Sequence, residues 1–326
     1  MARAVLGLPH TGGGALEILD LRHFTSADLR PLLLAETEYW GRHLDWDYQA
    51  SAEMILRYID AKILPGYAAV AHGRVQAYAF YVYEGAKGVI GDLFVLPGTA
   101  DADDLERRLL AHVIETLQNS PGIHRIEAQL LAHESGQVAG PLLREGFLRY
   151  PRLFMLVPLN RATIVPTRQE GIQLRRWQES DFHEAASVIT EAYREHVDAE
   201  INDQYRSDSG SMRFLNNIIR FPGCGTFDAQ ASFVAVDRSG GQILGLILSS
   251  RVKEDVGHIT QVCILPDRRS RGVGQALIAA AVAEMKRRRF TALSLTVTEA
   301  NYRAVELYRR LGFETQHVFD AFVWEG

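Results

Sequence analysis

An internal repeat constrains the fold of this chain more than any other feature of its sequence. Three segments in the first half have counterparts in the second half, and the counterparts keep their order. Repeated segments in a fixed order indicate a repeated structural unit. Their offsets, 153, 169 and 166 residues, drift only by amounts that loops can absorb. The matching pairs are residues 21–28 with 174–181, 93–97 with 262–266, and 143–147 with 309–313.

The repeat predicts two tandem copies of one fold, over residues 15–160 and 171–326. The joint near residues 160–170 lies beside Pro158, contains Pro166 and lacks apolar periodicity, as a linker does. Each half has the alternating strand and helix patterns of a mixed α/β fold. In the second half, we expect strands over 233–237, 243–249, 258–265, 292–297 and 317–324, and helices over 182–197, 274–288 and 300–311.

Bulk composition excludes several classes of function. A net charge of −5 gives no general affinity for nucleic acid or anionic membranes. The two cysteines, Cys224 and Cys263, have no metal-ligand spacing and imply no disulfide framework. No signal peptide and no apolar run of about 20 residues is visible. We therefore expect a cytoplasmic protein with no metal, nucleic-acid or membrane partner.

A glycine- and arginine-rich segment lies between a predicted strand and a predicted helix. The first N–H groups of a helix have no partner within the helix, and the helix dipole favours an anion there. Glycines at 272 and 274 permit close approach of a phosphate and a positive φ angle. A tight turn with solvated arginines would have the same composition. The segment is Arg269-Ser270-Arg271-Gly272-Val273-Gly274, which matches neither GxGxxG nor GxxxxGK[ST].

A second motif follows that loop and makes the pattern specific. It reads Asn301-x-x-Ala304-x-x-x-Tyr308-x-x-x-Gly312-Phe313, after a strand with Val-x-Ile-x-Pro and a loop with R-x-x-G-x-G. Together these motifs resemble the general-control-related N-acetyltransferase (GNAT) superfamily, and the resemblance covers most of residues 171–326. It implies a mixed-sheet acetyltransferase fold, present twice, with acetyl-CoA as co-substrate. It also implies direct transfer of acetyl to a primary amine in a ternary complex.

The resemblance also implies where acetyl-CoA binds. The strand before the loop would pair with the pantetheine arm, and a bulge there would aim an N–H group at the thioester carbonyl. Cys263 is then a structural thiol and carries no acetyl group. The implied cofactor-binding residues are Val262, Cys263, Ile264, Arg269, Ser270, Arg271, Gly272, Val273, Gly274, Asn301 and Tyr308.

Two residues match the positions of the family's acid and base. Tyr308 would protonate the departing thiolate, since a phenol with a pKa of about 10 is protonated at neutral pH. His258 would take the proton of the amine, and an ordinary imidazole suits that role. A core tyrosine and a solvated strand-start histidine are the alternatives. Glu299 would either hold a cationic substrate or favour a helix N-terminus.

The first half lacks the same chemistry. Its loop after Pro97 is acidic, with Asp101, Asp103 and Asp104 where the second half has arginines and glycines. The offsets place Val89, Ser135 and Leu142 at the positions of His258, Asn301 and Tyr308. We therefore expect a degenerate copy that binds no acetyl-CoA. It would either stabilise the second domain or form one wall of its substrate cleft.

The sequence leaves the acceptor open between a small molecule and the N-terminus or a lysine of a protein. An acyl-CoA-binding sensor without turnover, or a transferase for another acyl-CoA, is the alternative function. Residues 198–225 occupy the position of a variable substrate loop in relatives, and one hypothesis is that they form a mobile lid. The oligomeric state is open.

Overall fold

Both halves of the chain contribute to one mixed β-sheet in the computed structural model, which describes residues 16–162, 164, 170–221, 223 and 225–326. Within these residues the sheet has 13 strands in the order β1-β2-β3-β4-β5-β13-β6-β12-β11-β10-β9-β7, with β8 paired to β10. The strands of the first half are β1 (Glu17–Asp20), β2 (Gly66–Ala71), β3 (Arg74–Glu84), β4 (Lys87–Val95), β5 (Arg125–Gln129) and β6 (Leu148–Pro158). Those of the second half are β7 (Ile172–Arg176), β8 (Thr226–Phe227), β9 (Phe233–Asp237), β10 (Ile243–Lys253), β11 (Val256–Ile264), β12 (Ala292–Thr298) and β13 (Glu314–Glu325).

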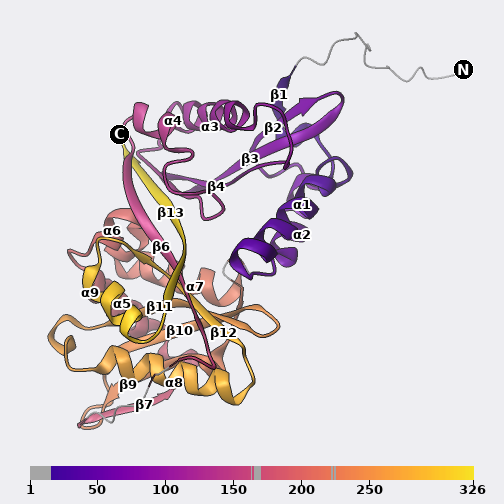
Figure 1. Ribbon diagram of the computed structural model, residues 1–326. Helices are drawn as coiled ribbons and strands as arrows, with labels where there is room; N and C mark the ends of the chain where they lie inside the picture. Colours follow the sequence, from indigo (N-terminus) through magenta and orange to yellow (C-terminus); the bar gives the residue numbers. More distant parts are fainter. Residues whose placement is uncertain (1–15, 163, 165–169, 222, 224) are drawn as a thin grey trace, which may run out of the picture.

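The last strand of each half inserts into the sheet of the other half. β13 pairs with β5 on one side and with β6 on the other, while β6 also pairs with β12. Figure 1 shows β6 and β13 running side by side between the two ends of the molecule. The halves are therefore consecutive in sequence but interlocked in space, and each needs the other to complete its strand pairing.

Helices cover both faces of the sheet in each half (Figure 1). In the first half, α3 packs on one face of β3 and β4, and α1 and α2 pack on the other. In the second half, α8 and α9 cover one face, and α5 and α7 the other. The helices are α1 (Ser26–Leu44), α2 (Gln49–Asp60), α3 (Ala102–Gln118), α4 (Ala139–Arg144), α5 (Phe182–Tyr193), α6 (Val197–Ile201), α7 (Asp208–Arg220), α8 (Val273–Arg287) and α9 (Tyr302–Arg310).

The same distortion occurs at corresponding positions of the two halves. The β10–β11 register skips Thr260 and the β3–β4 register skips Gly91, so each central strand carries a β-bulge. Positions 91 and 260 are related by the offset of 169 that already relates residues 93 and 262. The parallel pairing of β11 with β12 ends at Ile259, and that of β4 with β5 ends at Ile90. The strands diverge beyond these residues.

The mixed α/β fold predicted from the sequence is confirmed, with small shifts at element ends. The helix expected over 182–197 ends at Tyr193, because Glu195 adopts a left-handed φ of 59° that a continuing helix cannot accommodate. A short helix, α6, begins after it. The described part of residues 198–225 forms α6, a 3₁₀ turn (Asp203–Arg206) and α7, and Leu215 of α7 is fully buried. Cys224 lies outside the described residues.

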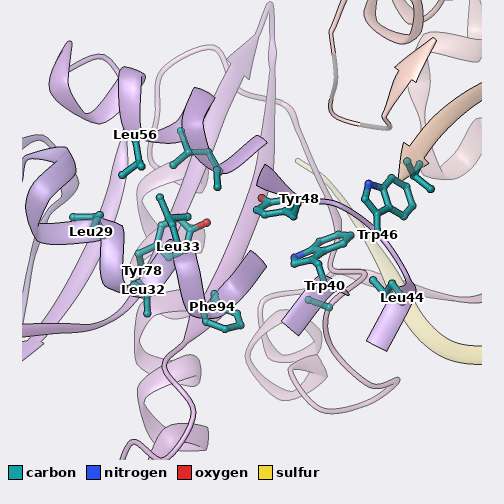
Figure 2. Close-up of a cluster of buried hydrophobic side chains, with 14 of the residues drawn as sticks. Leu29, Leu32, Leu33, Trp40, Leu44, Trp46, Tyr48, Leu56, Tyr78 and Phe94 are labelled. Carbon is teal, nitrogen blue, oxygen red and sulfur yellow. The ribbon is translucent and has the colours of Figure 1, made fainter. Parts of the chain in front are cut away.

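An aromatic cluster extends the hydrophobic core of the first half to residues of the second half (Figure 2). Trp40 stacks on Tyr48 with ring centroids 4.7 Å apart, and Trp46 meets Trp40 edge-on at 5.7 Å. The loop that carries Trp46 is tied to β10, since Asp47 donates its N–H to the Val252 carbonyl at 2.8 Å. The core of the first half thus reaches the central strands of the second.

Among the described helices, none combines the length and apolar character needed to cross a bilayer. Within the same part of the chain, no group of three or more His, Cys, Asp or Glu side chains is arranged to hold a metal ion.

Candidate active site

A cavity of about 710 Å³ lies where β11 and β12 diverge. Its wall is formed by the end of α5 and the start of α6, by β11, by the loop into α8, by β12 and by α9. One residue of the first half, Arg152 of β6, completes it. The cavity brings together most of the residues predicted from sequence: Val262, Cys263, Ile264, Arg269, Ser270, Gly272, Val273, Gly274, Asn301 and Tyr308. Arg271 is exposed outside this wall, and His258 is also not part of it.

The N-terminus of α8 forms one end of the cavity. Gly272 caps this helix with a left-handed φ of 79°, which a residue without Cβ adopts at little cost. Among the described residues, no side chain caps the helix, and its first turn contains no acidic residue. The free N–H groups and the dipole of the helix therefore remain available to an anion. Arg269 holds the loop in place by donating to the carbonyls of Ala192 and Ile264.

β11 offers a free backbone edge along the cavity. Leu265 donates its N–H to Leu244 of β10 at 2.9 Å. Since N–H groups alternate along a strand, those of Val262 and Ile264 face the opposite side, where β12 has diverged. The bulge at Thr260 marks the start of this free edge. An extended ligand can pair with it as an added strand would.

Cys263 is buried beside this edge. Burial raises the pKa of its thiol to about 12, so it carries no thiolate at neutral pH. It packs among the apolar residues under α5 and α7. This environment fits the structural role expected from sequence.

Tyr308 reaches the cavity from α9 and is otherwise buried. Burial, and then the nearby carboxylate of Asp198, raise the pKa of its phenol above the ordinary value. The hydroxyl is therefore protonated throughout the physiological range. Asn301 caps α9 by accepting the Ala304 N–H at 3.4 Å, and its amide faces the cavity. Glu299 is exposed and does not line this cavity.

The structure does not support His258 as the general base. Its ring lies 4.9 Å from that of Trp46 and stacks on Phe154, and its Nδ1 lies 2.9 Å from the Ser294 hydroxyl. Only 4% of the residue is exposed. Burial, with the Arg152 charge nearby, lowers its pKa to about 3. A weakly basic imidazole enclosed by the aromatic cluster cannot reach an amine in the cavity.

A different histidine, His196, does line the cavity. It precedes α6, and 22% of its side chain is exposed. Its Nδ1 lies 3.1 Å from the Asp198 N–H and 3.6 Å from the Asp198 carboxylate, while its Nε2 lies 3.3 Å from the Asn301 amide nitrogen. A neutral imidazole has one lone pair, so the two N–H contacts belong to alternative tautomers. No motif marks this residue in the sequence; only the fold brings it beside Asn301.

Burial lowers the pKa of His196, although the Asp198 carboxylate opposes the shift. The imidazole is therefore neutral at pH 7 and can accept a proton. Asp198 is held in turn by the Thr298 hydroxyl at the end of β12. The His196 imidazole can therefore take up a proton from a group in the cavity, and the Asp198 carboxylate can stabilise the resulting cation.

Residues of the first half hold the segment that carries His196 and Asp198 on its side away from the cavity. Lys87 of β4 lies 2.6 Å from Asp203 and 3.0 Å from Glu127 of β5. Arg125 binds Glu127 at 2.6 Å and also donates to the Glu200 carbonyl at the end of α6. We call Lys87, Arg125 and Glu127 the buried charge cluster, since at most 8% of each side chain is exposed.

Among the described residues of the first half, the N-terminus of α3 differs from that of α8. α3 is capped by Asp101, with a left-handed φ of 55°, and Asp103 and Asp104 lie in its first turn. These carboxylates already complement the helix dipole and would repel a phosphate. After the bulge, Asp92 turns inward and accepts the Tyr48 hydroxyl at 2.7 Å. Leu142, at the position of Tyr308, is fully buried.

Comparison with known proteins finds a family model that matches the part of the chain containing most of the cavity wall. Residues 176–313 match the model of the Acetyltransferase (GNAT) family. The chain is 28% identical over 232 residues to the mycothiol acetyltransferase of Thermobispora bispora. This alignment covers 68% of this chain and 72% of the relative. The chain is 39% identical over 71 residues to the uncharacterized N-acetyltransferase MJ1207 of Methanocaldococcus jannaschii, which is 22% of this chain and only 31% of that protein.

Two solved structures share the fold over nearly the whole chain. A GCN5-related N-acetyltransferase from Sphaerobacter thermophilus superposes with a TM-score of 0.70 at 20% identity, covering 95% of both chains. A tandem GNAT protein from the clavulanic acid biosynthesis pathway gives a TM-score of 0.61 at 16% identity, covering 95% of this chain and 98% of the other. At these low identities, the similarity to the two structures shows a shared fold and nothing further about function.

Proposed function

The chain contains an acetyltransferase domain of the GNAT family, and on that premise we propose that it is an acetyl-CoA-dependent N-acetyltransferase with a primary amine as acceptor. One observation carries the proposal. A single cavity joins the N-terminus of α8, which no described side chain caps, the free edge of β11 and the protonated hydroxyl of Tyr308. These are respectively a site for a pyrophosphate, a site for an extended pantetheine arm and a proton donor for a thiolate.

The residues present fit this co-substrate. The α8 N-terminus and Gly272 would hold the pyrophosphate, and the N–H groups of Val262 and Ile264 would pair with the pantetheine amides. Acetyl-CoA would supply an activated acyl group as a thioester. An N–H group at the free edge would polarise the thioester carbonyl as negative charge develops on its oxygen.

The proton transfers belong to His196 and Tyr308. In the proposed step the amine nitrogen bonds to the carbonyl carbon, the carbon–sulfur bond breaks, and the electron pair leaves with sulfur. His196 takes the proton lost by the amine, and the Asp198 carboxylate stabilises the imidazolium. Tyr308 gives its proton to the thiolate and regains one from solvent. We assign no covalent role to Cys263, whose thiol is protonated.

We also propose that the first half is a degenerate copy without cofactor chemistry. Its bulge and its order of strands and helices match those of the second half. Its acidic helix N-terminus and the buried Leu142 do not suit acetyl-CoA.

Gly272→Asp should weaken acetyl-CoA binding by about 10-fold or more, because it adds a negative charge and a side chain at the anion site. Isothermal titration calorimetry measures this directly. Gly241→Asp is the matched control, since Gly241 has a similar φ of 71° but lies in an open turn. Equal affinity in the two variants would refute the cofactor assignment. Tight binding without acetyl transfer to any amine would instead indicate an acyl-CoA-binding protein.

The pH profile should report His196. Since burial lowers its pKa below 6.5, the enzyme should add an acid limb to kcat/KM below that value, when the imidazole becomes protonated. This limb is separate from the fall caused by protonation of the free amine, whose ordinary pKa is about 8 to 10. His196→Gln should abolish this acid limb and lower kcat/KM by about 100-fold, the usual contribution of a general base. His258→Gln is the control. If the limb vanished in the His258 variant and remained in the His196 variant, our assignment of the base would be wrong.

A further inference from the structure

The wall of the cavity contains an arginine that comes from the other half of the chain and forms no ion pair with a described residue. Arg152 is on β6, opposite Thr298 of β12 and Phe319 of β13. Its NH1 donates to Gln129 at 2.6 Å, and its Nε is buried without a hydrogen-bond partner among the described residues. No carboxylate of the described chain forms an ion pair with it.

Other partly buried arginines do have a carboxylate. Arg149 on the same strand binds Asp320 at 2.9 Å, Arg175 binds Asp181 at 2.7 Å, and Arg288 binds Asp228 at 2.6 Å. A partly buried guanidinium in a cavity wall, with no carboxylate partner among the described residues, is suited to a planar anion.

Arg152 lies on the opposite face of the sheet from the phosphate end of the cavity. Side chains alternate along β6, so Arg152 shares a face with Phe154, which packs in the aromatic core of the first half. The neighbouring Leu153 and Met155 pack instead with α8. The proposed pyrophosphate site at the N-terminus of α8 therefore lies on the face opposite Arg152. We place Arg152 at the other end of the cavity, where the acceptor would enter.

A second donor at this end also lacks a partner. Gln261 of β11 lines the cavity and is 5% exposed, and its Oε1 accepts the Tyr193 hydroxyl at 3.2 Å. Its Nε2 has no partner among the described residues. Because Oε1 is occupied, the amide presents its donor. The acceptor end therefore offers a cation and a neutral donor to one ligand, while Asp198 and His196 offer a carboxylate and a base.

We propose that the acceptor is a zwitterionic amine, such as an amino acid, whose carboxylate is bound by Arg152 while its amine faces His196 and Asp198. The assignment rests on the proposed acetyl transfer and names the substrate class of the same site. It gives the first half a direct part in substrate recognition, because Arg152 reaches the cavity only through the exchange of the last strands.

The test compares amino acids with their carboxamides as acceptors, with release of CoA as the readout. We expect kcat/KM to favour the acid over its amide by about 10- to 100-fold, the range for a hydrogen-bonded charged group. Arg152→Gln should remove that preference by raising the KM of the acid, without changing the KM of acetyl-CoA. Arg152→Lys should restore part of it. Arg251→Gln, at an exposed position of β10 outside this cavity, is the control.

Two results would overturn the proposal. One is equal or better turnover of the carboxamides by the native protein, which would leave acetyl transfer intact. The other is a rise in the KM of acetyl-CoA in Arg152→Gln, which would place Arg152 at the donor. If that variant fails to fold, Gln261→Glu gives the same comparison, since an added carboxylate should select against the acids. Acetyl-CoA binding without turnover of any amine would mark failure of the transferase function itself.

Discussion

Replacing Tyr308 by phenylalanine should lower the rate of acetyl transfer by about 100- to 1,000-fold, within the usual contribution of a general acid. The substitution removes one hydroxyl from a ring that is packed against Phe313 and exposed by only 7%. The ring itself fills the same space, so the fold and the wall of the cavity should persist. Acetyl-CoA affinity should therefore change little, whereas the departing thiolate would lack its proton donor.

The measurement should separate chemistry from product release. Single-turnover experiments with saturating acetyl-CoA report the chemical step, which a slow release of CoA would otherwise mask. Tyr302→Phe is the matched control, because this tyrosine is on the same helix and 75% exposed. Burial and the Asp198 carboxylate raise the Tyr308 pKa, so the native rate should not decline up to pH 10. An unchanged single-turnover rate in the variant would exclude Tyr308 as the acid.

Local patterns pointed to the stretches of the cavity wall that are continuous in the sequence. The loop from Arg269 to Gly274 and the motif from Asn301 to Phe313 each occupy one strand–helix junction or one helix. Each element carries most of the residues predicted on it to the cavity, although Arg271 stays outside the wall. The fold class followed for the same reason, since apolar periodicity records which face of each element is buried.

The environment of His258 could not be predicted in this way. Its burial depends on Trp46, which is 212 positions earlier in the chain. The loop bearing Trp46 reaches β10 only because the two halves share a sheet. Likewise, His196 becomes a candidate base through Asn301 and Asp198, and Arg152 reaches the cavity through strand exchange. Strand exchange leaves no local signal, because each half keeps the same order of elements whether or not its last strand is swapped.

The buried charge cluster provides the second large expected effect. Lys87→Met should destabilise the protein by about 3 kcal/mol or more, because it leaves the buried Glu127 carboxylate facing an apolar side chain. Burial alone would lower the pKa of Lys87, but the Glu127 and Asp203 carboxylates raise it, so the native ammonium is charged. A shift in the urea unfolding midpoint measures the loss. Lys253→Met is the control: that lysine also joins the two halves, through Asp45, but 49% of its side chain is exposed. A loss of at most about 1 kcal/mol is expected there.

The cluster should also affect activity, because it fixes the segment that carries Asp198. Asp203 and the Glu200 carbonyl are held by Lys87 and Arg125 on one side, while the other side of this segment lines the cavity. Amide hydrogen exchange in residues 197–206 should therefore accelerate in Lys87→Met under conditions where the rest of the chain remains protected. The KM of the amine should rise while that of acetyl-CoA is unchanged, since in the described part of the chain no hydrogen bond or ion pair joins the α8 loop to the cluster. A uniform acceleration of exchange, with both KM values raised together, would show that Lys87 stabilises the whole fold and does not position the acceptor side of the site.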